Sequence, residues 1–215
     1  PWVFSGAIKK IKNQHGREAV PPNGAMVNVV DNKDQFLGMG HYADGSIAVR
    51  IITFEESEPD SDVWGNRLRN AVNYRDSLGL IDGANTNVCR LVHAEGDGLP
   101  GLIVDFYNGT AVVQCHSIGM HLHRDAIVEA IKESLGDRCT AIYDKSAETL
   151  PAKIRESVTN GYLWGDGPGN TEVREYDSTF SVDWVNGQKT GFFVDQHCVF
   201  ANPTQPCQLG IVSLH

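Results

Sequence analysis

Short apolar runs alternate with turn-forming residues over the first 56 residues of the chain. The runs are rich in β-branched residues and lie at 26–30, 35–40 and 46–52. β-branched side chains favour strands, whereas the Gly, Pro, Asn and Asp residues between the runs favour tight turns. Closely spaced short strands of this kind predict a small β-barrel in residues 1–56.

The period of the pattern changes after an acidic, proline-containing run at residues 55–62. Apolar residues then recur every three or four positions from Trp64 to Leu78, and Gly79 follows as a helix stop. The acidic run is typical of a solvated segment and not of a binding site. We therefore predict a linker that contains a helix in residues 57–80.

Strand-like and helix-like patterns are mixed in the part of the chain that follows. Apolar strand-like runs lie at 88–92, 102–106, 110–115, 140–143, 173–176 and 179–184, and helical spacing occurs near 120–135 and 153–157. This mixture predicts an α/β domain over residues 81–187. The fold class expected for the chain is α+β, with a small barrel followed by a mixed α/β middle domain.

The net charge of the 215-residue chain is −9, which argues against nucleic-acid binding by the surface as a whole. The charge is unevenly distributed: residues 1–54 hold six basic and four acidic residues, whereas the remainder holds twelve and twenty-three. Bound RNA would therefore lie on the N-terminal domain. The residues expected to contact it are Lys9, Lys10, Lys12 and Arg17.

Two arginines of the predicted linker helix are weaker candidates for RNA contact. Arg67 and Arg69 lie off the apolar stripe of that helix. Their side chains can reach phosphate groups. Most arginines in such positions are only solvated, so this alternative stays open.

One glycine pattern in the middle domain matches a dinucleotide-binding fingerprint by its letters alone. Gly96, Gly98 and Gly101 form a G-x-G-x-x-G. That fingerprint must open a helix, so that phosphate meets free N–H groups at the helix N-terminus. Here Pro100 precedes the last glycine, and the strand-like run 102–106 follows it. A tight hairpin explains the glycines better.

Neither a metal centre nor a disulfide framework is predicted. Four potential metal ligands lie close in sequence, but their spacing points them in different directions; they are Cys115, His116, His121 and His123. The five cysteines are scattered and contain no Cys-x-x-Cys pair, which is typical of reduced thiols in a cytoplasmic protein. No run of apolar residues is long enough for a membrane-spanning helix.

The residues from Gly187 to Gln196 combine chemistry that an ordinary strand or helix does not need. Two glycines, an amide, a lysine, a hydroxyl, two aromatic rings and a carboxylate lie close together. Glycine lets a backbone approach a ligand closely, and adjacent phenylalanines can cover a ring. The segment predicts either a binding loop that enters a short apolar strand or a tight hairpin with a buried Phe pair.

Four stretches of the chain, in this order, resemble one known family. Residues 1–8 resemble its HPWVFSGxI opening, 95–105 its EGDGLPGLIVD hairpin, 143–146 a YEKS-like strand end and 187–196 its GQKTGFFLDQR signature. The family comprises PUA-containing class I S-adenosylmethionine (SAM)-dependent methyltransferases. Its members modify C5 of a cytosine in 23S ribosomal RNA.

The resemblance implies a PUA domain that binds ribosomal RNA and a SAM pocket bordered by the last of these stretches. The residues expected at that pocket are Gln188, Lys189, Thr190, Gly191, Phe192, Phe193 and Asp195. No catalytic residue is expected in this chain, because the family's catalytic cysteine belongs to a Rossmann-like methyltransferase domain that we expect to be missing. Residues 188–215 would hold the start of that domain, and the uncharged stretch 197–215 indicates an aberrant tail.

Two functional hypotheses follow from these residues. The first is the RNA-binding part of a SAM-dependent rRNA methyltransferase, inactive as this chain alone and with little or no affinity for SAM. The second is a stand-alone RNA-binding or adapter module without enzymatic activity. A homo-dimer is a further expectation, because exposed Phe192 and Phe193 would favour self-association where the missing domain leaves a surface open.

Overall fold

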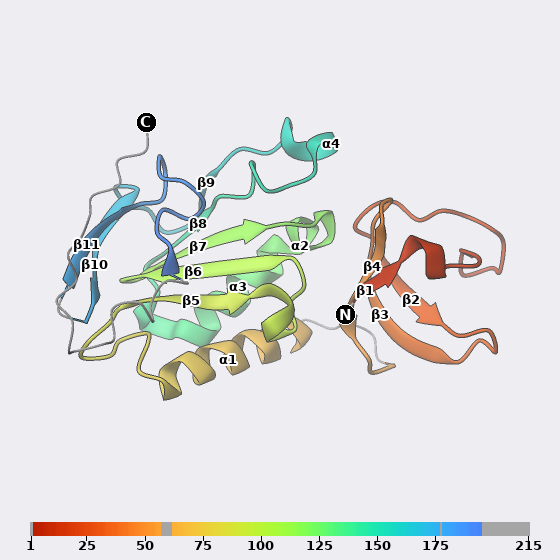
Figure 1. Cartoon of the computed structure of the whole chain (residues 1–215), viewed down its shortest axis with the longest axis horizontal. Helices are drawn as coiled ribbons and strands as arrows, with labels where there is room; N and C mark the ends of the chain where they lie inside the picture. The colour runs from red at the N-terminus through yellow and green to blue at the C-terminus, as the bar shows by residue number, and fades with distance from the viewer. Residues whose placement is uncertain (1, 57–61, 177, 195–215) are drawn as a thin grey trace, which may run out of the picture.

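Two sheets of unequal size dominate the computed structural model, which describes residues 2–56, 62–176 and 178–194. Figure 1 shows a small sheet at one end of the molecule, a larger sheet with helices in the middle and a two-stranded hairpin at the opposite end. The strand order is β1-β4-β3-β2 in the small sheet, β5-β6-β7-β8-β9 in the large sheet and β10-β11 in the hairpin.

The small sheet is antiparallel throughout and consists of β1 (Trp2–Phe4), β2 (Met26–Val30), β3 (Phe36–Tyr42) and β4 (Ile47–Thr53). The three strands predicted from the apolar runs are confirmed. β1, which the pattern did not single out, pairs with β4 and is followed by the 3-10 turn η1 (Ser5–Ala7). One face forms a small core around Tyr42, Val49 and Ile51. In the described residues β1 and β2 do not pair, so the sheet is open there.

The large sheet consists of β5 (Val88–His93), β6 (Leu102–Tyr107), β7 (Thr110–Cys115), β8 (Ala141–Asp144) and β9 (Gly161–Trp164). Its pairs are antiparallel except β7–β8, which are parallel and therefore need a crossover connection. The crossover contains α2 (Ile118–Leu122), α3 (Arg124–Leu135) and the 3-10 turn η3 (Gly136–Arg138).

Two details of this sheet differ from the sequence prediction. The single helix expected over 120–135 breaks at His123, whose Nδ1 lies 2.8 Å from the carbonyl oxygen of Gly119. β9 was not predicted, because its residues are only half-buried and carry no clear alternation. The short helix expected near 153–157 is present as α4 (Ala152–Arg155).

The glycine-rich connection between β5 and β6 is a hairpin, as predicted. It contains the 3-10 turn η2 (Ala94–Asp97), and β6 begins directly after Gly101. Gly98 and Gly101 have φ angles of +70° and +83°, in a region that other residues rarely adopt. The glycines therefore serve the turn, and a strand, not a helix, follows them.

Different layers cover the two faces of the large sheet, since successive residues of a strand point to opposite sides. Helices α1 (Asp62–Ser77) and α3 cover one face, where Leu68 and Phe106 belong to the main core (Figure 1). The hairpin of β10 (Asn170–Glu175) and β11 (Ser178–Asp183) covers the other face, around Tyr107 and Trp184. Of the helices that the structure describes, none has the length and apolar character needed to cross a membrane.

The helix that the sequence pattern placed in a linker belongs to the main core. Trp64, Leu68, Ala71 and Val72 are each at most 3% exposed and pack in the same cluster as the buried side of the large sheet. α1 also packs along α3. The helix is therefore a structural part of the α/β unit.

Replacing Leu68 with alanine tests this placement of α1. Leu68 is fully buried, so the change leaves a cavity, and the free energy of unfolding should fall by about 2–5 kcal/mol. Leu78→Ala is the matched control, because Leu78 is 54% exposed, and it should cost about 0.5 kcal/mol or less. Urea unfolding followed by circular dichroism measures both changes. Equal losses would contradict the placement.

Candidate functional site

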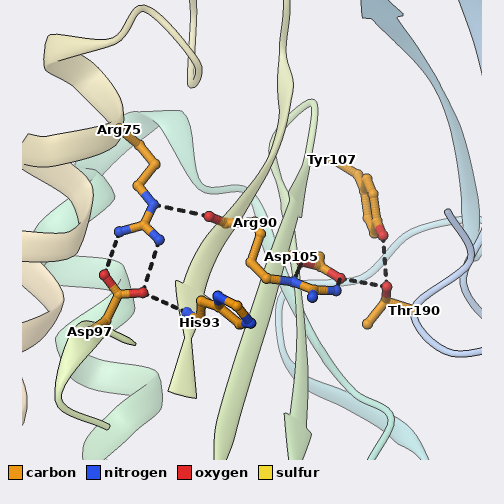
Figure 2. Close-up of polar contacts among 7 residues, drawn as sticks. All are labelled: Arg75, Arg90, His93, Asp97, Asp105, Tyr107 and Thr190. Carbon is orange, nitrogen blue, oxygen red and sulfur yellow. Dashed lines mark hydrogen bonds and ion pairs between the residues drawn. The ribbon is translucent and has the colours of Figure 1, made fainter. Parts of the chain in front are cut away.

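A buried carboxylate on β6 organises the contacts of the predicted binding loop. Asp105 is fully buried, and both of its carboxylate oxygens accept hydrogen bonds. The guanidinium of Arg90 on β5 donates to it from Nε at 2.9 Å and from Nη2 at 3.1 Å. The hydroxyl of Thr190 donates to the same carboxylate at 2.6 Å (Figure 2). Since an unpaired buried charge is costly, these groups form one unit.

Tyr107 completes this unit on the side of the loop. Its hydroxyl donates to Oγ1 of Thr190 at 2.8 Å, which leaves the threonine proton for Asp105. Desolvation raises the pKa of Tyr107 far above its ordinary value, and the charge of Asp105 adds to the shift. Tyr107 therefore stays protonated and acts as a donor. Thr190 is 1% exposed, so its hydroxyl is used within the fold.

Two further contacts fix the start of the loop. Lys145, a buried lysine just after β8, donates from Nζ to the carbonyl oxygen of Gly187, and desolvation lowers its pKa. At the end of β11, the Asp183 carboxylate accepts backbone hydrogen bonds from Val185 and Asn186 at 2.9 and 2.8 Å. The backbone and side-chain hydrogen bonds from Asn186 hold the pKa of Asp183 below its usual range.

The backbone of the loop closes against the end of β11. Gly191 has a φ of +107°, and a Cβ at this position would lie 2.6 Å from the carbonyl oxygen of Asp183. Lys189 also has a positive φ, +52°, which is uncommon for residues other than glycine. This tight turn buries Thr190 and leaves Lys189 exposed.

Three of the residues predicted to bind the cofactor are exposed: Gln188, Lys189 and Phe193. Nζ of Lys189 lies 4.6 Å from the centroid of the Phe193 ring, within the range of a cation–π contact. Phe193 is 43% exposed, so one side of this pair is open to a ligand.

The other predicted cofactor residues lie behind this surface or beyond the described chain. Thr190 donates to Asp105, and Gly191 packs against the carbonyl of Asp183. Phe192 is half-buried, and its ring centroid lies 5.2 Å from that of Phe180. Asp195 lies outside the described residues. The loop makes a tight turn, but the Phe pair is not buried, because Phe192 is half-buried and Phe193 is exposed.

A second polar network, which sequence reasoning missed, ties α1 to the large sheet. Arg75 donates to both oxygens of Asp97 at 2.5 and 2.8 Å, and from Nε to the carbonyl oxygen of Arg90 at 3.0 Å. Asp97 also accepts the backbone N–H of His93 at 2.6 Å (Figure 2). The signal in the sequence was the place of Arg75 on the apolar stripe of its helix, where a charge needs a buried partner.

The four N-terminal basic residues predicted to contact RNA are exposed: Lys9, Lys10, Lys12 and Arg17. Lys9 and Lys10 line a groove of about 630 Å³ that Glu18 and Asp44 also border. A β-bridge joins Lys12 to Glu18 and holds this excursion of the chain beside the groove. Lys9, Lys10 and Lys12 thus lie in one region, and the carboxylates of Glu18 and Asp44 limit its positive charge.

The two arginines of α1 have different roles. Arg67 donates to the carbonyl oxygens of Ile52 and Gly98, so it joins the small sheet to the β5–β6 connection. Desolvation lowers its pKa. Arg69 is exposed and donates to Oδ1 of Asn66 at 2.7 Å. Arg69 is the more exposed of the two.

The cysteines of the described chain are buried free thiols: Cys89, Cys115 and Cys139. Desolvation raises their pKa values to about 12, 12 and 11, so the thiols stay protonated and are poor nucleophiles. Within residues 2–56, 62–176 and 178–194, no group of three or more His, Cys, Asp or Glu side chains is placed to hold a metal ion.

Known proteins resemble both parts of the chain. Residues 1–54 match the family described as PUA-like domain. The chain is 37% identical over 198 residues to ribosomal RNA large subunit methyltransferase I of Alteromonas mediterranea, and 34% identical over 199 residues to that of Escherichia coli O157:H7. Both matches cover 91% of this chain but only 47% and 48% of the relatives. The chain therefore spans about half the length of the curated relatives it matches.

Solved structures share the fold. A candidate SAM-dependent methyltransferase from Streptococcus mutans superposes with a TM-score of 0.70 at 19% identity, over 88% of this chain and 48% of that one. A second candidate methyltransferase, complexed with SAH, gives the same TM-score at 18% identity, over 88% of this chain and 47% of its own. At these identities the likeness concerns the fold alone.

These superpositions correct the expectation that the methyltransferase domain is missing from this chain. They cover 88% of the chain, so the mixed sheet with α1 and α3 lies within a fold shared with methyltransferase structures. The expectation failed because it rested on where the family motifs stop, whereas the order and direction of strand pairing decide which fold a chain builds. Residues 1–54 match the PUA-like domain family, and 88% of the chain shares its fold with structures described as methyltransferases.

Proposed function

We propose that this chain carries the RNA-binding part of a SAM-dependent methyltransferase that modifies ribosomal RNA in the cytoplasm. The observation that carries the proposal is the similarity, over 91% of the chain, to proteins named ribosomal RNA large subunit methyltransferase I. The PUA-like domain and its exposed basic residues support RNA binding. The four sequence motifs support a finer assignment, methyl transfer to C5 of a cytosine in 23S rRNA.

The exposed face of the loop fits part of the SAM molecule. SAM presents a carboxylate, a sulfonium cation and a flat adenine ring. Lys189 can pair with a carboxylate, the Gln188 amide can donate or accept, and Phe193 offers an aromatic face to a ring or a cation. Thr190 and Gly191 would hold this surface in place from behind. SAM, when bound, supplies the methyl group, and these residues would bind and orient it.

Self-association is a separate proposal that rests on the same surface. Phe193 is 43% exposed beside the half-buried Phe192, and exposed apolar surface favours contact with another copy. Size-exclusion chromatography with light scattering, performed at high protein concentration, distinguishes a dimer from a monomer.

A chimeric enzyme tests the proposed activity. This chain would replace the matching segment of the E. coli relative, and methylation of 23S rRNA would be measured in cells that lack the relative. We expect methylation at C5 of a cytosine to be restored, because the chain would supply the RNA-binding and loop residues. A chimera that folds and binds RNA without methylating it would favour the stand-alone RNA-binding module.

Lys189→Ala in the same chimera tests the cofactor surface. If Lys189 pairs with the carboxylate of SAM, its loss should raise the KM for SAM by roughly tenfold, the effect of one charge-assisted hydrogen bond. RNA affinity should be unchanged. Lys33→Ala, which removes another exposed lysine outside the loop, is the control. Identical KM values in the two variants would remove Lys189 from the cofactor site.

Replacing Lys9, Lys10 and Lys12 together with alanine tests the RNA surface. RNA affinity should fall. The slope of log affinity against log salt concentration should become shallower by roughly one for each lost phosphate contact, so by about two to three in the triple variant. The control removes the same charge elsewhere, at Lys33, Lys132 and Lys153. RNA titrations at two salt concentrations measure both. Equal losses in the two triple variants would show that only the net charge matters.

A further inference from the structure

The outer face of β1 carries two aromatic side chains that the proposed function leaves unused. Trp2 and Phe4 are 48% and 54% exposed, while Val3 between them packs against the small core. Their ring centroids lie 6.3 Å apart with an interplanar angle of 89°. Adjacent large apolar residues with this exposure form a patch, and such patches mark contact sites more often than scattered single residues do.

The register of the small sheet places a cation beside this patch. Trp2 pairs with Arg50 on β4, and Arg50 pairs with His41 on β3, so the three residues form a row on one face of the sheet. At the His41 end, the α/β unit covers this face of the sheet. His41 is 2% exposed, and its ring centroid lies 6.0 Å from that of Trp64 on α1. At the Trp2 end the face stays open.

The orientation of Trp2 suits contact through the face of its ring. Nε1 donates to Oε1 of Glu95 at 2.8 Å, which uses the single polar donor of the indole and fixes the ring. The side chain of Arg50 makes no hydrogen bond or ion pair with another residue that the structure describes, and Arg50 is half-buried beside Trp2. The site therefore offers two aromatic rings and one cation.

Resting on the proposed RNA function, we propose that Trp2, Phe4 and Arg50 form a stacking site for unpaired nucleotides of RNA. Unpaired bases can stack on aromatic side chains, whereas bases inside a duplex are already stacked on each other. An arginine beside such a ring can contact the phosphate or stack on the base. The charge is also complementary, because residues 1–17 contain four basic and no acidic residues. The carboxylate of Glu95 would repel the phosphates of RNA. The RNA backbone would therefore run past Arg50 and away from Glu95.

Tryptophan fluorescence gives a direct readout of this site. Among the four tryptophans Trp2 is the exposed one, since Trp64 and Trp184 are at most 3% exposed and Trp164 is half-buried. The chain would be titrated with a short single-stranded oligouridylate and with a fully paired RNA hairpin of similar length. We expect the single strand to quench the emission strongly and the hairpin to quench it weakly.

Variants separate stacking from charge. Trp2→Ala and Phe4→Ala should each weaken oligouridylate binding about 5- to 100-fold, because each removes one stacking surface, and the salt slope should stay unchanged. Phe54→Ala is the control, because Phe54 is 65% exposed outside the patch, and it should bind as the parent does. Trp2→Phe should keep the affinity within about threefold while the quenching disappears, which retains a test if the alanine variants unfold.

Two results would overturn the inference. If Trp2→Ala and Phe4→Ala bind oligouridylate like the parent while the triple-lysine variant binds weakly, the stacking site is wrong and the RNA function stands. If the parent chain itself binds no RNA, both the stacking site and the RNA function fail, and the patch is left for contact with an apolar protein surface.

Discussion

The paired carboxylate of Asp105 is the constraint on which the candidate site depends. A carboxylate that is fully removed from water costs several kcal/mol unless hydrogen bonds and an opposite charge compensate it, and Arg90 and Thr190 supply both. Arg90 comes from the neighbouring strand, whereas Thr190 is 85 positions away in the sequence. The need to satisfy one buried charge therefore brings the 187–194 segment back onto the large sheet.

The same contact divides the loop into a supporting side and an exposed side. Thr190 and Gly191 are used by the fold, through the carboxylate of Asp105 and the close approach to Asp183. Gln188, Lys189 and Phe193 then face solvent on a backbone that Lys145 also holds. Groups held in this way lose little freedom on binding, which favours recognition of a small, polar and aromatic ligand. A buried contact also supports an exposed group in the small sheet. The stacking of His41 on Trp64 fixes one end of the row His41, Arg50 and Trp2.

The sequence predicted most strands, the hairpin at the glycine-rich turn and the helix with the apolar stripe of α1, because these follow from apolar spacing and turn chemistry. It could not predict the partners of its polar residues. Asp105 lies in an otherwise apolar strand, and nothing local indicates that Thr190 will reach it. Arg67 was a weaker candidate for phosphate contact, with solvation as the alternative, and its guanidinium joins two backbone carbonyls that are far apart in the sequence. The expected absence of the methyltransferase domain was wrong because it rested on where the family motifs stop, and motifs do not fix the fold of the residues between them.

Amide hydrogen exchange in Thr190→Val, compared with Thr190→Ser, tests most directly whether the Asp105 contact holds the loop. Valine keeps the shape of threonine but removes the hydroxyl, whereas serine keeps the hydroxyl. We expect exchange of residues 187–194 to become about tenfold faster or more in the valine variant and to stay near the parent rate in the serine variant. The rest of the large sheet should keep its protection. Unchanged exchange of the loop in Thr190→Val would show that Asp105 does not hold it, and the account of the site would then fail.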